Sequence, residues 1–557
     1  MRRTLLGLML VVLLLKVAPA AAEPAHGIAT PHPLATEVGE EVLAVGGNAF
    51  DVAVAVSAAL AVVEPYGSGL GGGGFWLLED AGADQRVMVD GRERAPLAAE
   101  ADLFTAGEAE PEQALDGPLA AAIPGAPAAL VHIAKAYGDL DLDAVLAPAI
   151  RLAREGFEVD ERYAWLADFR ADVLRAWGHG AEVFLADGEV PAEGALIRQP
   201  ELAETLERLA RHGHDGFYDG PVAARLVEAV QAAGGLWSRD DLAAYEVAER
   251  EPIEVEVDGL RLASAPPPSS GGIALAQMLQ MLSLFDLDAV DEAERIHIIV
   301  EVMRRAYHDR ARYLGDTDFV DVPVNRLLAD DYAAGLGATI RRDRATPSDI
   351  FPGPAVPEGG RNTSHFSVVD GDGNRVAATL SLNYPFGSGF MAPETGVILN
   401  NHMDDFTVEP GEPNAYGLVQ SDANRIEPGK RMLSSMSPTL LDHGERAAVI
   451  GTPGGSRIIT TVLLAALEFR EGGHAAALVE PERYHHQYLP DVVEHEPDAF
   501  DDAVRAGLEE RGHELEALGR TWGNSQAVVV EADGEIDVAA DPRGVGAARA
   551  RGRVGSH

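Results

Sequence analysis

The sequence predicts a mixed α+β fold in which both halves of the chain contribute helices and strands. Apolar residues three and four positions apart mark helices at residues 36–63, through much of 111–245 and over 273–313. Beyond residue 363 the pattern changes to short apolar runs separated by glycine-rich turns, which is typical of β-hairpins. At 557 residues, 46% of them hydrophobic, the chain can bury a large core and divide into two or more domains.

The first 22 residues have the order of a secretory signal. Arg2 and Arg3 precede an apolar stretch over residues 5–15, and small residues follow at 18–22. Because this stretch is too short to span a bilayer comfortably, we expect it to be removed and the chain to be exported, to the bacterial periplasm or the extracellular space. A retained membrane anchor is the alternative, since Lys16 leaves the cleavage point open. We expect no membrane span in the mature protein.

Composition excludes several classes of function. The chain has no cysteine, which excludes disulfides, a thiol nucleophile and cysteine-ligated zinc or iron-sulfur centres. A net charge of −45 argues against nucleic acid as a partner. The acidic residues are spread along the chain, as expected for a soluble surface that repels itself. Either a salt-rich habitat or an ordinary acidic secreted protein would account for this charge.

Two helices come first, over residues 36–45 and 49–63, and Gly46, Gly47 and the capping residue Asn48 separate them. The second helix is apolar almost all round, which predicts burial between layers. It leads into the sequence GSGLGGGG at residues 67–74, whose glycines allow close backbone approach. A phosphate cradle is the alternative, although no lysine follows the glycines. Residues 75–79 and 86–90 then form a predicted strand pair.

The remaining elements follow in order along the chain. Helical scaffold is predicted at residues 132–137, 142–154 and 201–212, and long helices at 273–285 and 293–313. Proline and glycine mark residues 344–362 as an exposed linker. After it we predict a hairpin of strands 366–369 and 376–382, a strand at 447–450, a helix at 457–467, and a last hairpin of 527–530 with 536–539.

The sequence NTSH at residues 362–365 joins the linker to the first of these hairpins. A threonine becomes a useful nucleophile when the peptide bond before it is cut, because its freed α-amino group can take the proton of its own hydroxyl. The sequence therefore predicts a precursor that cleaves itself between Asn362 and Thr363. The alternative is that Thr363 is an ordinary β-branched residue at the start of a strand.

Four further motifs follow in a fixed order: TSHFSVVD at 363–370, NNHMDDF at 400–406, LSSMSPT at 433–439 and GTPGGSR at 451–457. Earlier stretches belong to the same pattern: GGNA at 46–49, LGGGGF at 70–75, GRE at 91–93, PPPSSGG at 266–272 and YLGD at 313–316. Together they resemble the γ-glutamyltranspeptidase family of N-terminal-nucleophile hydrolases. The resemblance extends from about residue 27 to residue 543.

The resemblance implies a four-layer αββα sandwich whose two central antiparallel sheets are shared by two fragments of one precursor. These would be a large fragment, residues 23–362 with the linker at its end, and a small catalytic fragment, residues 363–557, which pair as a heterodimer. It implies no metal and no organic cofactor.

The resemblance also assigns a pocket for the γ-glutamyl donor. Arg92 matches the arginine that clamps the donor's α-carboxylate, and a guanidinium suits that bidentate contact. Ser434 and Ser435 match the paired serines that donate to the same carboxylate. Asn383 and Asp405 match the residues that receive the α-ammonium group.

Other matches concern the reacting carbonyl. Gly454 and Gly455 match the oxyanion hole, where consecutive amide groups converge on one oxygen. Tyr416 matches a lid tyrosine that excludes water, and Ser381 stands where bacterial relatives often carry a second threonine that assists the nucleophile. His402 is a departure, because relatives usually carry glutamine or glutamate there. We expect a protonated His402 to repel the donor's ammonium group, unless its side chain points elsewhere.

The function implied is transfer of the γ-glutamyl group of glutathione and related compounds, through a threonyl ester, to water or to an amino acid or dipeptide acceptor. A glutaryl acylase acting on cephalosporin-type amides would share the nucleophile without needing an ammonium pocket. An inactive extracellular binding protein is the alternative from a different class.

Overall fold

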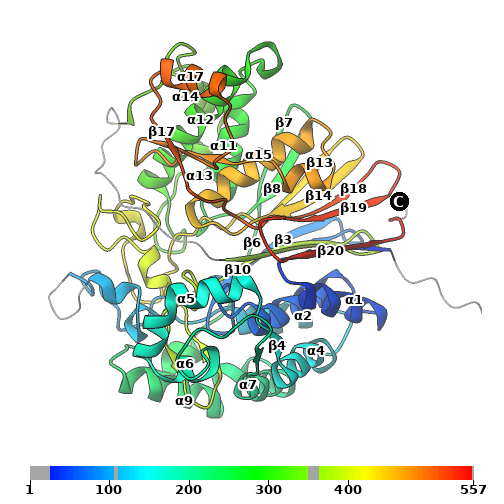
Figure 1. Ribbon diagram of the computed structural model, residues 1–557, viewed down its shortest axis with the longest axis vertical. Coiled ribbons are helices and arrows are strands. Elements are labelled where there is room, and N and C mark those ends of the chain that lie inside the picture. Colours follow the sequence, from blue (N-terminus) through cyan, green and yellow to red (C-terminus); the bar gives the residue numbers. More distant parts are fainter. Residues whose placement is uncertain (1–24, 106–110, 349–362, 555–557) are drawn as a thin grey trace, which may run out of the picture.

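The computed structural model describes residues 25–105, 111–348 and 363–554. Two β-sheets pack face to face, and helices cover the outer face of each, so the layers run helix, sheet, sheet, helix (Figure 1). The predicted α+β sandwich is confirmed. The expected signal, Asn362 and most of the expected linker lie outside the described residues.

The helices of the first outer layer come from the first half of the chain. They are α1 (Pro33–Ala44), α2 (Ala49–Val63), α3 (Ala126–Ala136), α4 (Leu142–Glu155), α5 (Glu161–Ala176), α6 (His179–Phe184), α7 (Pro200–His212), α8 (Asp215–Tyr218), α9 (Gly220–Ala232) and α10 (Arg239–Ala243). Every residue of α2 is buried, as its apolar surface predicts, and a capping box between Asn48 and Asp51 starts this helix.

The second outer layer covers the other sheet. Its helices are α11 (Gly271–Leu282), α12 (Glu292–Tyr313), α13 (Val324–Leu327), α14 (Asp330–Gly337), α15 (Ile458–Arg470), α16 (Ala475–Val479) and α17 (Asp502–Glu510). Within the part of the chain that the structure describes, every helix is too short or too polar to cross a membrane.

One central sheet has seven antiparallel strands. Its order is β20 (Ala547–Arg551), β1 (His26–Thr30), β9 (Ser364–Val369), β10 (Arg375–Ser381), β2 (Gly73–Asp80), β3 (Gln85–Gly91) and β6 (Ala248–Arg250). The predicted hairpin is thus β9 with β10, paired from Arg375↔Val369 to Leu380↔Ser364. Strands β1, β6 and β20 were not predicted, because their short sequences show no alternating pattern.

The other large sheet has six antiparallel strands. They run β19 (Ile536–Ala540), β18 (Gln526–Val530), β14 (Arg446–Gly451), β13 (Thr439–His443), β8 (Leu260–Ser264) and β7 (Ile253–Val257). Here β14, β18 and β19 match predicted strands within one residue at each end. Both of these large sheets contain strands from before and after the predicted cut, so neither segment forms either of the two alone.

The core fills the spaces on both sides of the seven-stranded sheet. In β2, Trp76 and Leu78 pack with the first helical layer, whereas Phe75 and Leu77 pack with the second sheet and its helices. All four side chains are buried. Because both faces of the central strands are covered, these strands read as continuous apolar runs rather than alternating ones.

Buried charges on α12 hold the segment that leads into the predicted linker. Glu301 is fully buried and accepts hydrogen bonds from Thr346 N at 3.0 Å and from Arg305 Nη1 at 2.7 Å, and it also pairs with Arg304. Ser348 N donates to Asp491 Oδ2 at 2.7 Å, across to the segment that follows the predicted cut. Residues 346–348 are therefore anchored from both sides.

We predict that Glu301→Ala destabilises the fold strongly, because it leaves the guanidinium groups of Arg304 and Arg305 buried without their carboxylate. Breaking a buried ion pair in this way costs about 3–5 kcal/mol. Urea denaturation followed by circular dichroism measures the loss. The exposed Glu292 on the same helix gives the control Glu292→Ala, expected to cost less than about 1 kcal/mol. Equal midpoints for the two variants would contradict the anchoring role.

Candidate active site

A small cavity of about 30 Å³ gathers the predicted functional side chains from distant parts of the chain. Its lining includes Arg92, Arg310, Thr363, Ser381, Asn383, His402, Asp405, Tyr416, Ser434, Ser435 and Gly455. The structure thus brings together all the predicted site residues that it describes except Gly454, which lines the neighbouring cavity. Small-molecule sites are usually about ten times larger, so a donor needs this cavity to open.

Thr363 lies directly before β9 and is buried, with 6% of its surface exposed. Because Ser364 pairs with Leu380, Thr363 lies level with Ser381 on β10. Their hydroxyl oxygens are 3.4 Å apart, at the long end for a hydrogen bond. Ser381 Oγ also accepts a hydrogen bond from Asn383 N at 2.8 Å. The hydroxyl expected beside the nucleophile is therefore present.

Glu64, at the end of α2, fixes the start of β9 and was missed by sequence reasoning. Ser364 Oγ donates to Glu64 Oε2 at 2.6 Å, and Tyr66 OH donates to Glu64 Oε1 at 3.2 Å. Burial raises the pKa of Glu64. A Cβ atom on Gly67 would lie 2.6 Å from Ser364 Oγ, so the chain needs glycine there to approach β9. An acid directly after a wholly apolar helix was the available signal.

The two charged side chains expected to bind the α-carboxylate and the α-ammonium group of the donor form an ion pair with each other in this structure. Arg92 is fully buried, and its Nη2 contacts Asp405 Oδ2. Its Nη1 lies 3.3 Å from Glu93 Oε2, and its Nε donates to Met432 O at 3.3 Å. A ligand that carries both a carboxylate and an ammonium group could replace this pair, each charge meeting its opposite.

His402 faces the same charged region, so its side chain does not point elsewhere. It lies on a short 3-10 turn, His402–Asp405, and its Nδ1 is 2.8 Å from Glu93 Oε1. Both side chains are buried. Although burial alone would raise it, the pKa of Glu93 is lowered by His402 and Arg92. Glu93 is therefore an anion held between two basic groups, and sequence reasoning did not assign it this place.

Arg310 of α12 is the second buried cation of the cavity, and the sequence analysis did not single it out. Its Nη2 donates to Ser435 Oγ at 3.2 Å and its Nε to Ser270 Oγ at 3.0 Å. Its Nη1 has no hydrogen-bond partner among the described residues. Burial lowers the pKa of Arg310 to about 10, so the group stays charged at neutral pH. The apolar spacing of α12 predicts only a packed helix, so it gave no sign that Arg310 lines a site.

The loop before α11 holds the serine pair in place. Ser434 N donates to Pro268 O and Ser270 N donates to Ser434 O, both at 2.8 Å. This explains the sequence PPPSSGG at residues 266–272, which sequence reasoning left without a role beyond its match to the family.

Gly454 and Gly455 lie between β14 and α15, and both have positive φ angles, of 144° and 58°. Residues with side chains rarely adopt such angles. The Tyr416 ring covers Gly455, because a Cβ there would lie 2.1 Å from ring carbons. Tyr416 OH donates to Asn383 O at 2.9 Å. Tyr416 therefore closes the cavity, as a lid would.

Protonation of Asp404 makes closure of this lid depend on pH. Ala415 N lies 3.3 Å from Asp404 Oδ2, and burial, followed by the charge of Asp405, raises the pKa of Asp404 to about 8. The closed arrangement thus favours the protonated acid. Opening would hydrate the carboxyl and return its pKa toward about 3.9. The resulting stabilisation of the closed state is complete below about pH 4 and is lost as the pH rises to about 8.

We predict that residues 413–418 open more readily at pH 8.5 than at pH 5.5, by about tenfold or more, because Asp404 loses its proton in the open state. Amide hydrogen exchange of this segment, corrected for the intrinsic rate at each pH, measures the opening. Asp404→Asn cannot ionise and should show no such dependence. The same pH dependence in both proteins would rule out Asp404 as its source.

Known proteins show the same sequence pattern. A family profile described as Gamma-glutamyltranspeptidase matches residues 35–551. The glutathione hydrolase proenzyme of Escherichia coli (strain K12) is 42% identical over 519 residues, which cover 92% of this chain and 89% of that protein. The glutathione hydrolase proenzyme of Pseudomonas aeruginosa is 39% identical over 540 residues, 95% of each chain.

Solved structures share the fold. The cephalosporin acylase from Bacillus halodurans has a TM-score of 0.83 at 27% identity, covering 97% of this chain and 99% of that one. The gamma-glutamyltranspeptidase of Helicobacter pylori has a TM-score of 0.56 at 38% identity, covering 58% of this chain and 93% of that one.

Proposed function

The chain belongs to the gamma-glutamyltranspeptidase family, and from this membership and the site we propose that it hydrolyses glutathione and transfers γ-glutamyl groups. One observation carries the proposal. Thr363, the Arg92–Asp405 pair and Gly455 line one cavity although they are far apart in sequence. A nucleophile beside two opposite charges suits a donor that is an amino acid at one end and an amide at the other.

The donor's charged end meets three kinds of group. Arg92 takes the α-carboxylate, with hydrogen bonds from Ser434 and Ser435, and Arg310 orients the Ser435 hydroxyl. Asp405 and Asn383 receive the α-ammonium group. The contact between Arg92 and Asp405 supports this assignment, because it places a cation and an anion side by side, as a ligand with a carboxylate and an ammonium group on one carbon requires.

Self-cleavage comes first. Thr363 Oγ1 attacks the carbonyl carbon of Asn362, the peptide bond gives way to an ester, and water hydrolyses the ester. The products are residues 23–362, after loss of the signal, and residues 363–557, and they remain together as a heterodimer. Burial of Thr363 between β9 and Ser381 supports this step by holding the hydroxyl in one place.

In the mature enzyme the free α-amino group of Thr363 takes the hydroxyl proton while Oγ1 attacks the donor's γ-carbonyl. The amide groups of Gly454 and Gly455 stabilise the developing negative oxygen. The leaving amine takes the proton, and a γ-glutamyl ester remains on Thr363. Water then releases glutamate, or the amine of an amino acid or dipeptide takes the γ-glutamyl group. Tyr416 excludes bulk water while the ester forms.

We predict that Thr363→Ala stays a single uncut chain on a denaturing gel and has no γ-glutamyl hydrolase activity, because the attacking hydroxyl is gone. Wild type should give two bands, the smaller beginning at position 363 by amino-terminal sequencing. The exposed Thr105 gives the control Thr105→Ala, which should cut normally. Two fragments from Thr363→Ala, or a small fragment with another first residue, would refute the mechanism.

A glutaryl acylase is the second candidate, and the likeness to the Bacillus halodurans cephalosporin acylase favours it. A glutaryl amide lacks the ammonium group, so it has no use for the carboxylate of Asp405. That carboxylate lines the cavity, which favours the γ-glutamyl donor instead.

Parallel assays with γ-glutamyl and glutaryl p-nitroanilides separate the two candidates. We predict that wild type prefers the γ-glutamyl compound and that Asp405→Asn lowers its kcat/KM by about tenfold to a hundredfold, the worth of one charged hydrogen bond. The kcat/KM for the glutaryl compound should rise or stay equal in that variant. Faster glutaryl turnover in wild type would establish the acylase. An inactive binding protein would turn over neither compound and give no fragments.

A further inference from the structure

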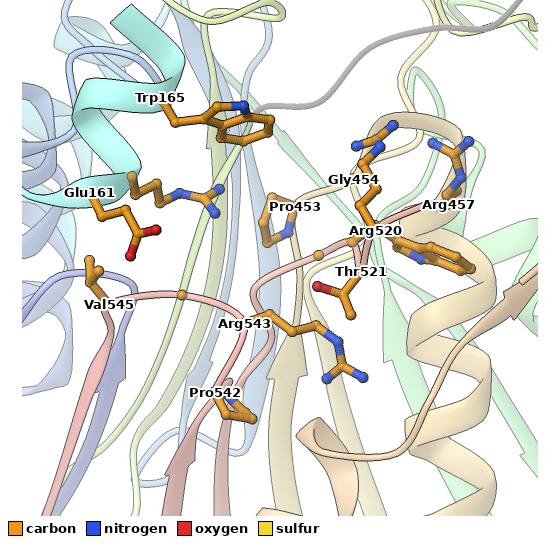
Figure 2. A pocket seen from close by; sticks show the side chains of 14 residues that line it. Glu161, Trp165, Pro453, Gly454, Arg457, Arg520, Thr521, Pro542, Arg543 and Val545 are labelled. Atoms are coloured by element: carbon orange, nitrogen blue, oxygen red, sulfur yellow. The ribbon is translucent and has the colours of Figure 1, made fainter. Parts of the chain in front are cut away.

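A second and larger cavity, of about 410 Å³, shares the turn of residues 453–457 with the donor cavity (Figure 2). Gly454 lines the larger cavity, whereas Gly455 lines the donor cavity. The other walls come from α5, from residues 520–523 and from residues 542–545. Trp165 reaches toward the open space from α5, whereas the Arg543 side chain extends away from Trp165, and its guanidinium donates to Glu496 (Figure 2).

This cavity is lined by positive charge in a chain whose net charge is −45. Its lining contains Arg162, Arg457, Arg520 and Arg543, and Glu161 is the one acidic residue among the described residues that line it. Glu494 holds Arg457, whereas Glu496, Asp541 and the backbone carbonyls of residues 479–481 hold Arg543, and none of these groups lines the cavity. Glu496 is almost completely buried behind Arg543. A ligand therefore meets guanidinium groups, and these bind carboxylates well.

Two indole rings add a flat apolar surface to this basic cavity. Trp165 lines the cavity and is 45% exposed. The Trp522 ring is buried, and the Arg457 guanidinium lies 5.5 Å from its centre. Stacking on an indole keeps a guanidinium in position without using all of its hydrogen-bond donors.

Two residues of the cavity wall, Gly454 and Arg162, lie close to groups assigned to the reaction. Gly454, one of the two glycines assigned to the oxyanion, lies in its wall. Arg162 is close enough to Glu64 to act on the charge of that carboxylate, whose Oε2 accepts from Ser364, the residue after Thr363. The cavity thus adjoins the turn and lies one layer of side chains from the start of β9, and Arg92, Ser434 and Ser435 do not line it.

We propose that this basic cavity binds the carboxylate of the leaving group and, after that group has left, the carboxylate of the dipeptide acceptor. The proposal rests on the proposed function and names the second half of its substrates. The part of glutathione that leaves is a dipeptide ending in a carboxylate. With that carboxylate on the arginines, its amine lies toward Thr363, where the amide bond breaks and the amine takes a proton.

The test compares donors with and without a carboxylate on the leaving group. Glutathione has one, and γ-glutamyl p-nitroanilide has none. We expect Arg520→Gln to raise KM for glutathione about tenfold, the worth of one charge-assisted contact, with kcat/KM for the anilide within about twofold of wild type. Arg520→Glu should raise KM for glutathione further. With the anilide as donor, KM for the acceptor glycylglycine should rise, and KM for glycylglycinamide should not.

Matched variants make the result specific. Arg549 is an exposed arginine on β20 outside the cavity, so Arg549→Gln should leave all four substrates unchanged. Glu161→Gln removes the cavity's one acidic group and should leave KM for glutathione equal or lower. Should Arg520→Gln fail to cut into two fragments, Arg520→Met, which keeps the length of the side chain without its charge, replaces it in the same assays.

The outcomes separate this inference from the proposed function. Wild type that turns over neither donor would defeat the proposed function. Wild type that turns over both, with variants that change both donors equally or neither, would defeat only the carboxylate site. A selective loss with glutathione and glycylglycine establishes it.

Discussion

The pairing of β9 with β10 is the constraint on which the site depends. β9 lies between β1 and β10 and is buried on both faces, so its register cannot shift without moving a whole row of core side chains. That register sets Thr363 level with Ser381, and the hydrogen bond from Ser364 to Glu64 holds the first residue of the strand. A hydroxyl at the end of a loop would have no comparable restraint. Here the sheet supplies the orientation that the reaction needs.

The site contains buried groups of both charges, whereas the protein as a whole carries an excess of negative charge. The surface is strongly acidic, whereas the donor cavity holds Arg92, Arg310 and His402 against Glu93 and Asp405. These protein groups left water during folding, so a bound zwitterion replaces their existing partners, and only the ligand's own charges have to be desolvated. The cavity is also small, since Tyr416 and the Arg92–Asp405 pair occupy the space that a ligand needs.

Much of this arrangement could be predicted from the sequence. Local signals were sufficient for α2, whose cap and apolar surface are both in the sequence, and for the β9–β10 hairpin with its glycine turn. They were insufficient for the pairing of β8 with β13, which joins residues about 175 apart. The β7–β8 hairpin was missed although β7 alternates as IEVEV and Asp258-Gly259 connects the two strands. The resemblance to a family supplied the site residues that lie in motifs. It gave no place to Glu64, Glu93 or Arg310, because each acts through contacts with residues far away in the chain.

The strand order has a consequence for how such a protein can change. In the seven-stranded sheet, β1 sits between β20 and β9, and β10 sits against β2, so the segments on either side of residue 363 alternate across it. The cut that we propose before Thr363 therefore has to follow folding, since neither half offers the other a completed surface. For the same reason halves taken from two relatives are not interchangeable modules. The side chains of every strand pair that joins the two halves would have to fit each other. Inheritance of both halves as one gene keeps that fit.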